Sequence, residues 1–179
     1  AKLKAQNSLA VTISQSGKSP DIVALQQAAR QAGAFTVAIV NVENSPAAHS
    51  ADLCLPLYAG VEQSVAATKS FIVSLVAAAS LVAAWSKDEI LSNAIQDLPK
   101  QLHEAAQLQW PSFVDSVATK GSLYVLGRGP SLPVAAEIAL KLKETCAIHA
   151  EAYSTAEVMH GPLELVENGF PILAFAQHD

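Results

Sequence analysis

Short apolar runs alternate along this chain with longer segments that carry alanine and leucine at helical spacing. In the first half these runs predict three strands, at residues 9–13, 35–40 and 53–57. Because strands alternate with helical segments and are apolar throughout, we expect a parallel sheet covered on both faces. The fold class predicted from this pattern is α/β, a three-layer αβα sandwich.

A helix is predicted after the first strand. Ser19 is its expected N-cap, Pro20 its first residue, and Gly33 the residue that ends it. Its core face is expected to consist of Ile22, Leu25, Ala29 and Ala32.

Three further helices are predicted, near residues 62–85, 88–98 and 99–117, before a second unit of strand, turn and helix. That unit begins with a strand at residues 122–126, passes through Gly127-Arg128-Gly129, and has its next strand at residues 171–176. We therefore expect two tandem units, at residues 1–98 and 99–179. Both look incomplete, which suggests a piece of a longer polypeptide.

Composition narrows the class of protein. The chain is 51% hydrophobic with a net charge of −5, which argues against nucleic-acid binding. Its longest apolar stretch, residues 71–85, is interrupted by Ser74 and Ser80 and is predicted to be a buried helix rather than a membrane span. Cys54 and Cys146 are predicted to be small buried residues rather than a disulfide or metal site. With no signal-peptide pattern, these features favour a soluble cytoplasmic protein.

The segment Ser14-Gln15-Ser16-Gly17-Lys18-Ser19 lies between a predicted strand and a helix N-terminus. Hydroxyl groups, free backbone N–H groups and the positive end of a helix dipole would converge there, as a phosphate monoester site requires. The glycine spacings of the nucleotide-binding loops are absent. A serine-rich capping turn remains the alternative.

Glu137, Lys141 and Glu144 are spaced to project from one helix face, with Ile138, Ala139, Leu142 and Cys146 on the opposite side. Paired carboxylates beside a lysine suit proton transfer between carbons, while a solvated ion-pair ladder is the alternative.

Other polar residues have weaker signals. Thr68 and Lys69 either reach a ligand or cap a helix, and Arg128 either binds an anion or is a surface residue. His149 and His160 fit structural roles, although His160 precedes a Gly-Pro break where a histidine could open a sugar ring. No cluster with metal-ligand spacing is present, so neither a metal nor an organic cofactor is implied.

The strings ISQSGKSPD, VAATKSF, LGRG and ALKLKETCAIHAEAYSTAEVMHGPLELV together resemble the sugar isomerase (SIS) domain family, over nearly the whole chain. The likeness extends to the isomerase half of glucosamine-6-phosphate synthase and to stand-alone relatives that deaminate amino-sugar phosphates. It implies the SIS fold, which is flavodoxin-like or Rossmann-like.

The resemblance also implies residue roles. Glu144 would be the base that shuttles a proton between C1 and C2, and Glu137 and Lys141 its supporting pair. His160 would open the sugar ring from the neighbouring subunit, which implies a homodimer. Phosphate ligands would be Ser14, Gln15, Ser16 and Ser19, with weaker substrate contacts at Val65, Ala67 and Thr68.

Two departures from the synthase pattern direct the functional hypothesis: KSPD follows SQSG, and Ala67 replaces a serine. We expect an isomerase/deaminase that converts glucosamine 6-phosphate to fructose 6-phosphate and ammonia, without nucleic-acid or membrane partners. The first alternative is the isomerase part of glutamine:fructose-6-phosphate aminotransferase. The second is a non-catalytic phosphosugar sensor.

Overall fold

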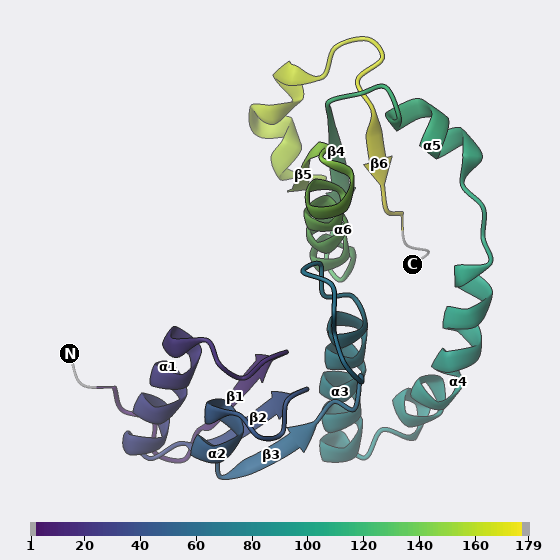
Figure 1. Cartoon of the computed structure of the whole chain (residues 1–179). Coiled ribbons are helices and arrows are strands. Elements are labelled where there is room, and N and C mark those ends of the chain that lie inside the picture. Colours follow the sequence, from purple (N-terminus) through teal and green to yellow (C-terminus); the bar gives the residue numbers. More distant parts are fainter. Residues whose placement is uncertain (1–2, 177–179) are drawn as a thin grey trace. The chain divides into compact units, whose positions relative to one another are not determined.

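The computed structural model describes residues 3–176. The chain divides into two compact units between Ala106 and Gln107, and each unit has its own three-stranded parallel sheet (Figure 1). Residues 99–106, which the sequence pattern assigns to the second unit, lie in the first. The predicted α/β class with parallel sheets is confirmed.

The first sheet has the strand order β1-β2-β3, with β1 at Leu9–Ser14, β2 at Phe35–Val40 and β3 at Leu53–Pro56. These are the three strands that the apolar runs predict. The helices of this unit are α1 (Pro20–Gln31), α2 (Pro46–Ser50), α3 (Lys69–Ser86) and α4 (Glu89–Ala106).

Helices cover both faces of this sheet. On one face, Ala38 and Val40 of β2 pack with Ala47 of α2 and with Val23 of α1. On the other face, Val37 and Ile39 pack with Val73 and Ala77 of α3. The alternation of side chains along β2 therefore gives each layer its own apolar contact.

Helix α1 begins after Ser19 with Pro20 and ends before Gly33, as the capping pattern predicts. Its core face differs from the prediction: Leu25 is 68% exposed, whereas Gln26 is 2% exposed. Gln26 is buried because its side-chain amide donates to Ala47 O and Ser50 Oγ, both at 2.8 Å. A polar side chain thus takes a core position because α2 offers it acceptors.

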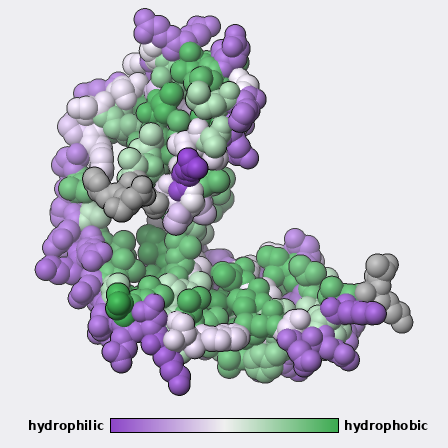
Figure 2. Space-filling view, turned by 180° about the vertical axis from the view of Figure 1, so that it is seen from behind, coloured by the Kyte–Doolittle hydropathy of each residue, from purple (hydrophilic) through white to green (hydrophobic). Residues whose placement is uncertain are grey.

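Two predictions about α3 are wrong. The helix begins at Lys69 rather than near residue 62, and it is not a buried helix. Its 18 residues are long and apolar enough to cross a membrane by length and composition, with a mean hydropathy of 1.6, yet only 11% of them are buried. Trp85 of α3 and Val11 and Ile13 of β1 are among the exposed apolar side chains, and apolar residues (green) are visible on the surface in Figure 2.

The two helices predicted near residues 88–98 and 99–117 are divided differently. Helix α4 continues through Pro99 to Ala106, and a separate α5 occupies Pro111–Val117. Proline usually ends or kinks a helix. Here Leu91, Ile95 and Leu98 are half-buried before the proline, whereas residues 100–106 after it are exposed, so burial does not explain why the helix continues.

The second unit has the strand order β5-β4-β6, with all pairs parallel. Leu123 and Val125 of β4 are fully buried against Ala135 and Ala139 of α6. Its elements are α5, β4 (Ser122–Gly127), α6 (Ser131–Cys146), β5 (His149–Ser154), two 3-10 turns (Glu157–His160 and Pro162–Leu165) and β6 (Ile172–Ala174).

Two sequence-based expectations fail in this unit. Strand β5 lies between α6 and the strand near residue 171, so two strands follow the helix rather than one. Cys146, predicted to be buried, is exposed, because the helix extends past the core at its last turn. In the first unit Cys54 is half-buried, and burial raises the pKa of its thiol.

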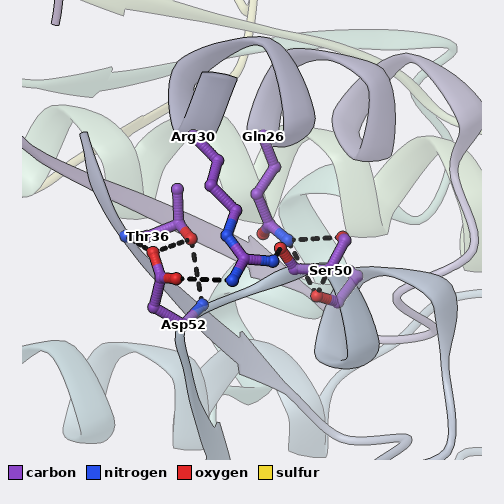
Figure 3. Close-up of polar contacts among 6 residues, drawn as sticks. Gln26, Arg30, Thr36, Ser50 and Asp52 are labelled. Carbon is purple, nitrogen blue, oxygen red and sulfur yellow. Dashed lines mark hydrogen bonds and ion pairs between the residues drawn. The ribbon is translucent and has the colours of Figure 1, made fainter. Parts of the chain in front are cut away.

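A polar network joins α1, α2, β2 and the residue before β3 at the amino edge of the first sheet (Figure 3). The Asp52 carboxylate accepts hydrogen bonds from Thr36 N (2.9 Å) and Thr36 Oγ1 (2.8 Å), and it forms an ion pair with Arg30 at 2.8 Å. Arg30 also donates to Ser50 O at 3.2 Å. The hydrogen bonds from Thr36, assisted by the Arg30 charge, lower the pKa of Asp52.

Asp52→Asn should lower stability at neutral pH because the amide loses the ionic interaction with Arg30. A lowered pKa in the folded state means that the carboxylate stabilises the fold above its ordinary pKa of 3.8, and that this stabilisation is lost as pH falls further. Urea unfolding should therefore show a wild-type advantage at pH 7 that shrinks at pH 3. Asp97→Asn, at an exposed position of α4, is the matched control and should show neither effect.

Candidate active site

The predicted phosphate loop lies at the carboxyl edge of the first sheet, where parallel α/β sheets bind ligands. Ser14 is the last residue of β1, and the side chains of Gln15, Ser16 and Ser19 are half-buried. Gly17 N donates to Ser14 Oγ at 3.1 Å, and Lys18 N donates to Ser16 Oγ at 3.3 Å. The structure thus brings the predicted residues of this loop together.

Gly17 fixes the shape of this loop. Its φ of +62° lies in the left-handed region, and a Cβ at this position would collide with Ser45 Oγ. Gly17 O accepts a hydrogen bond of 3.0 Å from Ala47 N, so the loop is attached to the start of α2. Neither α2 nor this close approach is predicted from the sequence, although the pair Ser45-Pro46 is a helix-start signal.

Ser19 occupies the predicted N-cap position of α1, but its side chain makes no capping hydrogen bond. The first N–H groups of a helix have no partner within the helix, and the helix dipole makes this end positive. The Ser19 hydroxyl and the start of α1 are therefore suited to an anion.

A hollow of about 570 Å³ opens beside Gln15 at the same edge of the sheet. Asn41 and Tyr58, which follow β2 and β3, line it together with Gly60 and Glu62. Sequence reasoning missed Asn41. Its position directly after a buried strand is a signal that could have identified it.

The segment that precedes α3 carries the weaker predicted contacts. Val65 is 96% exposed, Ala67 is half-buried, and Thr68 is the N-cap residue but makes no side-chain cap. Glu62 instead accepts hydrogen bonds from Ser70 N at 2.9 Å and Ser70 Oγ at 2.6 Å. These bonds lower the pKa of Glu62 and fold the segment back onto the start of the helix.

In the second unit, α6 presents the three predicted charged residues on one face. Lys141 Nζ lies 3.0 Å from Glu137 Oε1 and 2.9 Å from Glu144 Oε2. The exposed fractions of the three side chains are 19–29%. Partial burial lowers the pKa of Lys141, but hydrogen bonds to Glu144 and Glu137 outweigh it and raise the pKa overall. Lys141 is therefore a fixed positive charge between two carboxylates.

The remaining predicted residues lie at the carboxyl end of β5 and around the start of α6. His160 is exposed at the end of a 3-10 turn, and the following Gly161 has a φ of +134°. Arg128 is exposed and lines a hollow of about 450 Å³ with Ser131 and Thr155. Among residues 3–176 there is no group of three or more His, Cys, Asp or Glu residues that could hold a metal ion.

The sequence and the structure are both similar to those of sugar-phosphate proteins. The family model of the SIS domain matches residues 2–84 and 116–179. Glutamine–fructose-6-phosphate aminotransferase (isomerizing) from Bradyrhizobium diazoefficiens is 38% identical over 96% of this chain, and the same enzyme from Legionella pneumophila is 41% identical over 97%. The chain spans only 30% of the length of these curated relatives.

Two solved structures share the fold at substantial identity. A candidate phosphosugar isomerase from Silicibacter pomeroyi is 47% identical with a TM-score of 0.95, and the match covers 100% of this chain and 55% of that one. The C-terminal domain of glucosamine-fructose-6-phosphate aminotransferase from Francisella tularensis is 35% identical with a TM-score of 0.88, covering 97% and 52%. Since the family model matches most of the chain, this protein belongs to the SIS domain family.

Proposed function

We propose that this chain is the isomerase part of an enzyme that moves a proton between C1 and C2 of a hexose 6-phosphate. The observation that carries the proposal is the row of Glu137, Lys141 and Glu144 on α6, in which one lysine contacts both carboxylates. Proton abstraction next to a carbonyl or imine requires a carboxylate base, and Lys141 places a positive charge beside both candidate carboxylates.

The Ser14–Ser19 loop supports a phosphate-bearing substrate. Its hydroxyl groups and the start of α1 provide donors without the glycine-rich cradle that a diphosphate needs. Binding of a phosphate remote from the reacting carbons supplies energy that orients them, which contributes up to about 7–11 kcal/mol in favourable cases.

In this proposal each residue of the second unit has its own role. Glu144 is the base that carries the proton between C1 and C2. Lys141 forms an ion pair with Glu144 that positions it, and Glu137 in turn forms an ion pair with Lys141. His160, which is exposed next to a glycine, assists ring opening by acid–base transfer. A homodimer in which His160 acts on the neighbouring subunit's substrate remains part of the proposal, as does a cytoplasmic location.

The relatives favour an aminotransferase over the deaminase that the sequence motifs suggested. Both curated relatives named above are glutamine–fructose-6-phosphate aminotransferases. We therefore place the isomerase part of such an aminotransferase first, with glucosamine 6-phosphate as product. Deamination of glucosamine 6-phosphate is the second candidate, favoured by Lys18-Ser19-Pro20-Asp21 and by Ala67. A phosphosugar sensor is less favoured because both carboxylates and His160 are present.

Glu144→Gln should abolish exchange of the C2 proton of glucosamine 6-phosphate with solvent, because an amide cannot accept the proton. We expect a rate loss of at least about 100-fold, as for removal of a general base. Proton NMR in D2O measures the exchange with the complete protein. Glu167→Gln, at an exposed position of the same unit, should exchange at the wild-type rate. Exchange by the Glu144 variant at that same rate would exclude the proposed mechanism.

Gly17→Ala should remove phosphate binding and lower stability. A left-handed alanine costs about 1–2 kcal/mol before the collision with Ser45 is added. Thermal unfolding with and without inorganic phosphate measures both effects. Gly169→Ala is the control, because Gly169 also has a positive φ but its Cβ would meet only Lys120 Nζ, at an ordinary contact distance of 3.9 Å. The control should lose stability but keep the phosphate-dependent shift.

The two directions can be separated by one assay of the complete protein. Release of ammonia from glucosamine 6-phosphate in the absence of glutamine would establish the deaminase. Formation of glucosamine 6-phosphate from fructose 6-phosphate only when glutamine is present would establish the aminotransferase. We expect the second result, and ammonia release at a rate comparable to other turnover would contradict it.

A further inference from the structure

Asn41 connects three loops at the carboxyl edge of the first sheet. Its backbone N donates to Gln15 O at 3.2 Å, which ties the end of β2 to the predicted phosphate loop. Its side-chain Oδ1 accepts from Ala59 N at 2.9 Å, and its Nδ2 donates to Gly60 O at 2.7 Å. One residue therefore contacts the segments that follow β1 and β3.

The segment that Asn41 holds has an unusual backbone. Tyr58 has a φ of +54° and Gly60 a φ of +72°, so the chain reverses sharply after β3. A non-glycine residue in the left-handed region costs energy, and such a conformation persists only when its surroundings fix it. The Asn41 side-chain amide accepts a hydrogen bond from Ala59 N and donates one to Gly60 O, so it stabilises this reversal.

The reversal and the phosphate loop form walls of the same hollow. Gln15, Asn41, Tyr58 and Gly60 all line the space of about 570 Å³ beside the loop. The Asn41 side chain holds one wall, and its backbone N–H holds the carbonyl of Gln15 in the other. Release of the side chain would free Gly60, which lines the same hollow as Gln15.

We propose that Asn41 is a positioning residue for substrate binding, and that it acts through Gln15 and the Tyr58–Gly60 reversal. This inference rests on the proposed function, in which Gln15 is a phosphate ligand. We assign Asn41 to substrate binding rather than to proton transfer, because its hydrogen bonds are to residues of the first unit, which contains the predicted phosphate loop. Its loss should therefore change affinity and leave the chemical step unchanged.

The test compares Asn41→Ala with wild type in the complete protein. We expect KM for fructose 6-phosphate and the dissociation constant of inorganic phosphate to rise in parallel by about tenfold, the effect of misplacing one charge-assisted hydrogen bond. The kcat should stay within about twofold. Asn44→Ala, an exposed residue in the loop after β2, is the matched control and should change neither constant.

A second variant covers the case in which Asn41→Ala does not fold. Asn41→Asp keeps the acceptor for Ala59 N but cannot donate to Gly60 O, so it should weaken phosphate binding while it retains one anchor. A purely structural role for Asn41 predicts a lower melting temperature with KM and the phosphate constant unchanged, and this result would overturn the inference.

The outcomes also separate this inference from the proposed function. If wild type binds inorganic phosphate without turning over any hexose 6-phosphate, and Asn41→Ala weakens that binding, the inference holds while the proposed function fails. If wild type turns over fructose 6-phosphate and neither Asn41 variant changes KM, the function holds and the inference fails. Absence of both phosphate binding and turnover in wild type would reject both.

Discussion

Parallel strand pairing is the constraint on which the rest of this structure depends. Because β1, β2 and β3 run in the same direction, the residues that follow them meet at one edge. Gln15, Asn41 and Tyr58 are far apart in sequence and line one hollow for this reason. In the second unit the same rule brings Arg128 and Thr155, which follow β4 and β5, to another hollow. The chemistry available to each unit follows from strand direction.

Much of the fold is predictable because buried parallel strands have a simple sequence pattern. The runs that form β2 and β4 are continuous and apolar, and they were recognised with nearly correct ends. Strand β5 was missed because the sequence His149-Ala-Glu-Ala-Tyr-Ser154 alternates short and polar residues and resembles the end of a helix. Pro99 misled in the opposite direction, since α4 continues through it as one helix although proline usually breaks a helix.

The sequence predicts which residues form the candidate site, but it does not predict the contacts that hold these residues in place. Helical spacing alone places Lys141 between two glutamates, and the structure shows both ion pairs. The contact between Gly17 and Ser45 could not be predicted, because it depends on how a short helix docks against a loop. Asn41 was missed for a similar reason: its partners, Ala59 and Gly60, are contacts of the folded chain rather than features of a motif.

The Asp52 network and the predicted phosphate loop lie at opposite edges of the first sheet. Where β2 and β3 begin, hydrogen bonds and an ion pair connect Arg30, Thr36 and Asp52. Where the strands end, the edge of the sheet is lined by Gln15 and Asn41. Mutations at the edge with the Asp52 network should therefore lower the stability of the fold more than mutations at the opposite edge. If the proposed site is correct, substrate preference can diverge among descendants of this sequence through changes at the edge that Gln15 and Asn41 line, while the opposite edge keeps the sheet folded.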